Sequence, residues 1–88
     1  MEHHNCSLSL NGKAYDKHAK CYFDRFLRTI NIFEGTLTTR RNLYKASLSG
    51  NNEFEILLDD GRKGNIVIIM VDPRDQNSGD FRVSGRLS

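Results

Sequence analysis

Residues 61–73, GRKGNIVIIMVDP, contain an unbroken apolar run from Ile66 to Val71. A strand with one face in water alternates apolar and polar residues, so this run predicts a strand that is covered on both faces. One face is expected to lie in the core of a curled sheet. Two covers would serve the other face. The preferred cover is an amphipathic helix from elsewhere in the chain. The alternative is a second copy of the protein, and the run would then mark an oligomer interface.

The segment 14–30 is the candidate for that helix. At 100° per residue its apolar side chains fall within one arc of about 140°, the width of a core-facing stripe; they are Tyr15, Ala19, Tyr22, Phe23, Phe26, Leu27 and Ile30. A competing signal is Asn11-Gly12, a strong hairpin cue that would make 13–19 a strand. The helix is preferred because neither face of such a strand would be apolar.

After residue 31 the pattern changes to a period of two, which is typical of half-buried strands. The inward sets are Phe33, Gly35 and Leu37; Tyr44, Ala46 and Leu48; Phe54, Ile56 and Leu58; and Phe81, Val83 and Leu87. Short turns join these strands, so neighbours are expected to be antiparallel. Residues 1–5 are expected to be disordered and 72–80 to form a flexible loop.

The predicted fold is therefore α+β and mainly β, with residues 1–88 in a single domain. The helix 14–30 packs on a curled antiparallel meander or small open barrel of five to six strands. This order of elements is similar in outline to the cystatin fold. The Gln-x-Val-x-Gly inhibitory motif of that family is absent from the sequence, so the resemblance implies an outline of the fold and no function.

Charge and composition exclude some classes of protein. A formal net charge of +2 over 88 residues argues against a histone-like, strongly basic binder of nucleic acid. No apolar run approaches the roughly 20 residues of a membrane-spanning helix, and the first residues lack the apolar core of a signal peptide. We therefore expect a cytoplasmic protein without a membrane role, in which Cys6 and Cys21 are free thiols.

Metal binding and catalysis have little support in the sequence. His4, Cys6, His18 and Cys21 form two His/Cys pairs, which are weak metal candidates because their spacing matches no standard finger pattern. The chain has no serine elbow, phosphate loop or metal-binding helix motif. Asp59, Asp60 and Asp72 stand at strand ends, where acidic residues commonly bond the turn backbone. No enzyme activity, metal or cofactor is expected.

A binding function is the remaining expectation, and two versions differ in their site. The first is a protein partner or self-association, through the apolar run or through an edge strand that carries Phe81, Arg82, Val83 and Arg86. The alternative is nucleic-acid binding. In a meander the turns 40–42 and 60–63 share one rim, which would gather Arg40, Arg41, Arg62 and Lys63 to contact phosphates without reading bases. Aspartates in that rim and inward-facing aromatic residues count against it.

Overall fold

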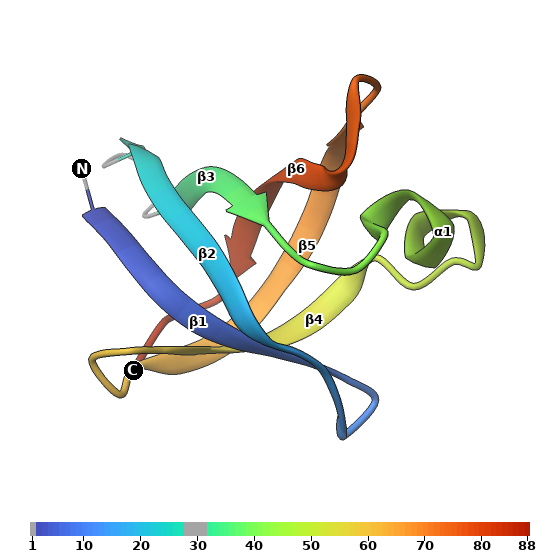
Figure 1. The fold of residues 1–88 in the computed structure, drawn as a ribbon. Coiled ribbons are helices and arrows are strands. Elements are labelled where there is room, and N and C mark those ends of the chain that lie inside the picture. The colour runs from blue at the N-terminus through green and yellow to red at the C-terminus, as the bar shows by residue number, and fades with distance from the viewer. Residues whose placement is uncertain (1, 28–31) are drawn as a thin grey trace.

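In this computed structural model, residues 2–27 and 32–88 are described, and they form six strands and a short helix (Figure 1). The elements are β1 (Glu2–Leu10), β2 (Lys13–Leu27), β3 (Ile32–Thr38), α1 (Leu43–Leu48), β4 (Glu53–Leu58), β5 (Lys63–Asp72) and β6 (Asp75–Ser84). The expected mainly β, antiparallel architecture is confirmed. The arrangement itself differs from the expected one in several places.

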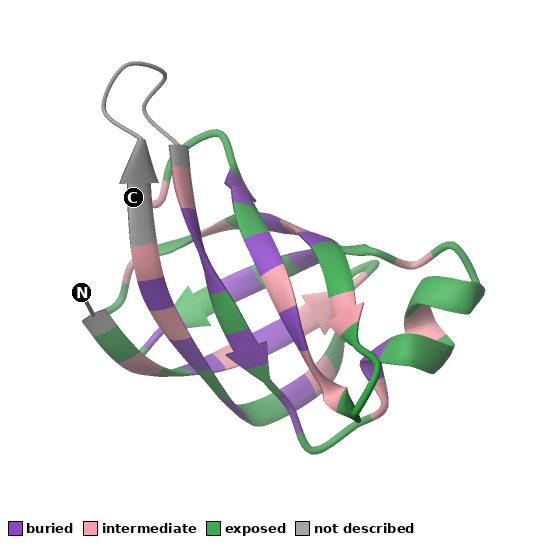
Figure 2. Cartoon of the chain, turned by 90° about the horizontal axis from the view of Figure 1, so that it is seen from above, coloured by how far each residue is buried: buried purple, intermediate pink, exposed green. Residues whose placement is uncertain are grey.

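The strands close into a barrel in the order β1-β2-β3-β6-β5-β4, with every neighbouring pair antiparallel. Closure comes from pairing of β1 with β4 over Cys6–Ser9 and Glu55–Leu58. Along the regular strands buried and exposed residues alternate, as the bands in Figure 2 show. The largest fully buried side chains are Phe81, Leu8, Leu37, Leu43, Ile56 and Ile66.

The helix predicted for 14–30 is wrong. Residues 13–27 form β2, while 28–30 lie outside the described residues. The hairpin that was set aside in favour of the helix is the structure that forms. Asn11 and Gly12 have φ of 53° and 79°, the two positive values that a tight antiparallel turn of this kind requires. With no helix ahead of the sheet, the outline similarity to the cystatin fold is lost as well.

Two bulges explain why β2 did not read as a strand. Cys6 is paired with Ala19 and Leu8 with Asp16, so Lys17 and His18 together oppose the single residue Ser7. A further extra residue, Tyr15, lies between the partners of Leu8 and Ser9. Each bulge shifts the alternation by one position. The inward residues are therefore 16, 19, 21 and 23, a spacing that follows no single period.

The strand predicted around Tyr44, Ala46 and Leu48 is also wrong, because these residues form α1. Asn42 caps this helix: its side-chain oxygen accepts a hydrogen bond from the Lys45 amide at 2.8 Å. Of the helix residues, Leu43 is buried, while Leu48 is 71% exposed. The chain thus stays at one end of the barrel between β3 and β4 and does not cross it (Figure 1).

The segments expected to lack regular structure are strands. Residues 2–5 belong to β1, while residue 1 lies outside the described residues. Residues 72–80 form the end of β5, a two-residue turn and the first part of β6. In that turn Asp72 Oδ1 accepts the Arg74 amide at 2.8 Å. At the preceding turn Asp60 Oδ1 accepts the Arg62 amide at 3.0 Å. The predicted turn hydrogen bonding is confirmed for Asp60 and Asp72, whereas Asp59 bonds His4 and the Asn5 amide of β1.

The apolar run in β5 is covered on one face only. Ile66 and Ile68 point into the barrel, where Phe81 is the partner of Ile68. A bulge at Ile69 then shifts the alternation, and Ile69 and Met70 are 50% and 60% exposed. The expected cover, helix 14–30, is a strand of the same barrel. The outer face of β5 therefore presents apolar side chains to solvent.

Candidate functional site

The four basic residues predicted to share one rim lie at opposite ends of the barrel. Arg40 and Arg41 follow β3, at the end that holds α1 and the β1–β2 turn. Arg62 and Lys63 lie where β4 passes into β5, at the end that holds the chain termini (Figure 1). The expected rim required two strands, around 44–48 and 54–58, between the two turns. Because α1 replaces the first of these strands, β4 alone separates the turns, and they fall at opposite ends of the barrel.

The predicted interaction edge is also wrong, since β6 pairs with β3 on one side and β5 on the other. Phe81 and Val83 are buried in the core. The Arg82 Nη2 donates to Glu34 Oε2 at 3.0 Å, across the β3–β6 pair. Arg86 follows the strand and is exposed.

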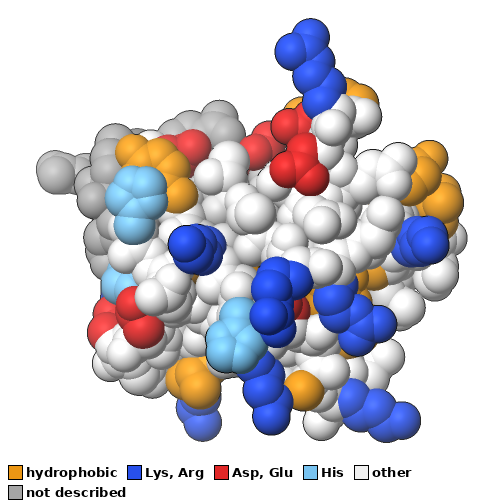
Figure 3. All heavy atoms as spheres, in the orientation of Figure 1, with side chains coloured by type: hydrophobic (Ala, Val, Ile, Leu, Met, Phe, Trp, Pro, Cys, Tyr) orange, Lys and Arg blue, Asp and Glu red, His pale blue; other side chains and the backbone are white. Residues whose placement is uncertain are grey.

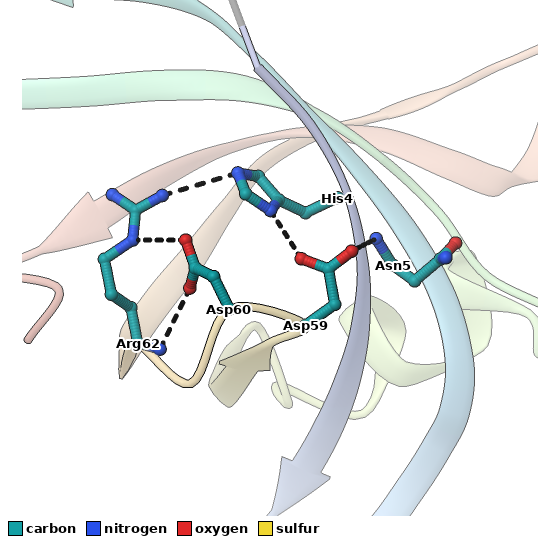
Figure 4. A network of polar contacts seen from close by, with 5 residues as sticks. All are labelled: His4, Asn5, Asp59, Asp60 and Arg62. Atoms are coloured by element: carbon teal, nitrogen blue, oxygen red, sulfur yellow. Dashed lines mark hydrogen bonds and ion pairs between the residues drawn. The ribbon is translucent and has the colours of Figure 1, made fainter.

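A polar network ties β1 to the turn between β4 and β5 (Figure 4). His4 Nδ1 lies 2.6 Å from Asp59 Oδ1, and the Asn5 amide donates to Asp59 Oδ2 at 3.1 Å. The His4 and Asn5 contacts hold the pKa of Asp59 below its ordinary value. Arg62 Nε donates to Asp60 Oδ2 at 2.9 Å, and its Nη2 lies 3.4 Å from His4 Nε2. Arg62 thus belongs to a structural junction.

The weak metal candidates are only partly brought together. Cys6 and Cys21 are both buried, and His4 is the register partner of Cys21. The hydrogen bond between the two thiols, together with burial, raises the pKa of Cys6, and the same bond lowers the pKa of Cys21. His18 is exposed, three residues along β2 from Cys21. Within the described ranges 2–27 and 32–88, no group of three His, Cys, Asp or Glu residues is placed to hold a metal ion.

The outer face of β2 and the segment that follows β3 form a surface whose polar residues are held in place by hydrogen bonds. Its base is Asp16, whose carboxylate is buried and accepts the amides of Arg40 at 2.7 Å and His18 at 2.8 Å. Burial alone would raise the pKa of Asp16, but these two bonds and the Arg40 charge outweigh it and lower the pKa. The Arg40 Nε lies 3.7 Å from Asp16 Oδ1, while its side chain stays 69% exposed.

An open hollow of about 460 Å³ lies over this junction. It is lined by Tyr15, Asp16, Lys17, His18, Arg40 and Arg41. The Arg41 guanidinium sits 4.9 Å from the centre of the Tyr15 ring, and the Tyr15 hydroxyl donates to the Asn42 carbonyl at 3.0 Å. Arg40 is thus held through its backbone amide and Arg41 through its guanidinium, while both side chains remain exposed, an arrangement suited to anions.

Further along β2 the same face carries Lys20 and an exposed ring stack. The rings of His3 and Tyr22 lie 4.2 Å apart at 17°, on register partners of β1 and β2. A second hollow, of about 290 Å³, is lined by His3, His4, Asn5, Lys20, Cys21 and Asp59. Figure 3 shows Lys, Arg and His side chains spread across this face of the molecule.

Charge is unevenly distributed around the barrel. The face formed by β2 and the segment after β3 carries exposed Lys13, Lys17, Lys20, Arg40 and Arg41. Asp16 is the aspartate that lines the hollow of about 460 Å³, and it is buried and paired with Arg40. Exposed acidic residues lie on β4 and at the turns, namely Glu53, Glu55, Asp59, Asp60, Asp72 and Asp75. A net charge of +2 therefore hides a basic face.

Sequence reasoning missed most of this surface. Residues 13–20, KAYDKHAK, do contain the signal, with three lysines, a histidine and a single aspartate. Read as a helix, the segment assigns its lysines to a solvated polar side. Read as a bulged strand, it places Lys17, His18 and Lys20 outward and Asp16 inward.

Comparisons with family models, with curated proteins and with solved structures found no match to this chain. In the part of the chain that is described, no helix has the length and apolar character needed to cross a membrane.

Proposed function

We propose that this protein is a binding module for nucleic acid, in which phosphates contact the basic face of β2. The observation that carries the proposal is the pair of arginines fixed by Asp16 and Tyr15, with Lys17 and Lys20 beside them on the same face. Phosphate contacts of this type give affinity without sequence information. The site differs from the predicted rim, because Arg40 and Arg41 are kept and Arg62 and Lys63 are replaced by the lysines of β2.

Titration of labelled oligonucleotides, followed by fluorescence anisotropy at several salt concentrations, tests the proposal. With four cations in contact with a single strand, the logarithm of the binding constant should fall with that of the salt concentration at a slope of about −3. Lys17→Glu and Lys20→Glu should each weaken binding and flatten that slope. These lysines are the cleanest probes because Arg40 and Arg41 also hold the fold together.

Arg74→Glu is the matched control, since it makes the same change of charge at the exposed β5–β6 turn, outside the hollow that Arg40 and Arg41 line. It should leave binding almost unchanged. Equal losses in Lys17→Glu and Arg74→Glu would mean that overall charge, and not this face, governs binding. No binding at low salt with tens of micromolar protein would contradict the proposal.

Self-association is a second candidate, favoured by the exposed Ile69 and Met70 on β5. A second copy could cover this face, as the alternative interpretation of the apolar run holds. Light scattering should then give a mass above that of one chain, 10.1 kDa, and Ile69→Lys should return it to the monomer. Leu48→Lys, at an exposed residue of α1, is the control that should leave the mass unchanged. A monomeric wild type at high concentration would rule this candidate out.

A further inference from the structure

We infer that the nucleic acid is single-stranded and that one of its bases stacks on the His3–Tyr22 ring pair. This inference rests on the proposed function and adds a second kind of contact to it. The phosphate contacts alone would accept a duplex or a single strand. An exposed aromatic stack on the same face distinguishes between them, because the bases of a duplex are already stacked on one another.

The ring pair is placed differently from the other aromatic contacts of the barrel. The Phe23–Phe81 and Tyr15–Phe54 contacts each involve a ring in the core, where they contribute to packing. His3 and Tyr22 lie on the outer face, with His3 exposed and Tyr22 half-buried. A buried ring stack stabilises the fold, whereas an exposed one offers a flat π surface that any base can extend.

The surroundings of the pair suit a nucleotide. The hollow of about 290 Å³ is bounded by the His3 ring and by Lys20, so a base on the rings leaves its phosphate within reach of the ammonium group. The exposed Asn5 side chain lies in the same hollow and can both donate and accept hydrogen bonds at a base edge. The hollow thus combines a stacking surface, a cation and a polar group, while its exposed carboxylate, Asp59, is bonded to His4 and to the Asn5 amide.

The two hollows lie along the same strand, since Lys17 lines one and Lys20 lines the other. From Lys17 to Tyr22 the chain advances roughly 16 Å along β2, at about 3.3 Å per residue. A strand of nucleic acid that lies along β2 can therefore place phosphates near Arg40, Arg41 and Lys17, pass Lys20, and bring a base to the ring pair. This length suits the lower end of the range of about 4–16 nucleotides found for small barrels that bind single strands.

The experiment compares two labelled strands of equal length and charge, an eight-nucleotide oligothymidylate and its abasic counterpart. Wild-type protein should bind the base-containing strand roughly tenfold more tightly, as loss of one base stack implies. Tyr22→Leu keeps apolar bulk but removes the ring, so it should abolish this preference and leave binding of the abasic strand unchanged. Tyr44→Leu, at an exposed tyrosine of α1, is the matched control and should keep the full preference.

The outcomes separate this inference from the function on which it rests. Equal binding of the two strands would overturn base stacking and leave phosphate binding intact. Tighter binding of a duplex of the same length would also overturn it. Failure to bind either strand would reject the proposed function and, with it, the inference. If Tyr22→Leu fails to fold, His3→Ala at the exposed member of the stack makes the same test, and an undiminished preference there would overturn the inference.

Discussion

Asp16 is the residue on which the basic face depends. Its two carboxylate oxygens accept amides from the bulge of β2 and from the segment after β3, and one of them also faces the Arg40 guanidinium. A buried carboxylate is costly unless it is bonded in this way. These hydrogen bonds offset the cost of burying the carboxylate. They also satisfy the His18 amide in the bulge and fix the backbone that carries Arg40 and Arg41.

Asp16→Asn should lower the free energy of unfolding by about 2–4 kcal/mol, because an amide cannot replace both charge-assisted acceptors. Urea denaturation measures the change, and Asp75→Asn at an exposed turn position is the control. The folded-state pKa of Asp16 lies below its ordinary value of 3.8, so the contribution is complete above that pH and is lost as pH falls through the folded-state value. The difference between wild type and variant should therefore shrink in acid. A constant difference down to pH 2 would contradict this assignment.

At the scale of elements, the β1–β2 hairpin decides the fold of the first third of the chain. The Asn11-Gly12 turn directs residues 13–27 back along β1, and the bulges keep 16, 19, 21 and 23 inside the barrel. The same segment satisfies a helical pattern by coincidence, since the inward residues Ala19 and Phe23 happen to be four apart and the half-buried Tyr15 and Tyr22 extend the apparent stripe. In this segment the turn residues Asn11 and Gly12 predict the structure better than the spacing of the apolar residues does.

Gly12→Ala should destabilise the protein by about 1–2 kcal/mol, because Gly12 has φ of 79°, where a side chain meets the following carbonyl. Thermal unfolding would show the loss as a lower Tm. Ala would be neutral or stabilising there if a helix followed. Asn51→Ala, in a connection outside the strands, provides the comparison. An unchanged Tm for Gly12→Ala would mean that the turn is not the one described.

At the scale of the whole molecule, closure removes the edges through which an open sheet would pair with a partner. β6 is held between β3 and β5, and β1 meets β4. The accessible surface of the strands is therefore the outer face of the barrel. Two of these faces differ sharply, the basic surface of β2 and the apolar surface of β5, and they carry the two functions proposed above.

Closure has a measurable consequence in hydrogen exchange. In a closed barrel, successive amides of 6–9 bond alternately to β2 and β4, so all of them should be protected in native-state exchange followed by NMR. In an open meander every second amide of this segment would face solvent and exchange rapidly. The amides of 36–38 in β3, paired with β2 and β6, provide the internal reference. Fast exchange of alternate amides in 6–9 would contradict closure.

The candidate site was harder to predict than the core because it depends on whether an even or an odd number of strands separates two turns. Whether Arg40 and Arg62 share a rim depends on the number of strands between them, and the change of one short strand into α1 reverses the answer. Phe81 and Val83 were correctly assigned to an inward face, but the same residues could not reveal whether their strand was at an edge. Neighbour relations between strands are set by long-range pairing, which local patterns do not contain.

The sequence by itself determined the β class and the inward sets of the regular strands, such as Phe54, Ile56 and Leu58, all of which are buried. It could do so because uninterrupted alternation assigns a face from local spacing alone. The tertiary structure alone decided the course of β2, the position of α1, closure of the barrel and the gathering of Lys17, Lys20, Arg40 and Arg41 on one face. Each of these depends on a bulge or a pairing partner, and a bulge is defined only by the strand opposite it.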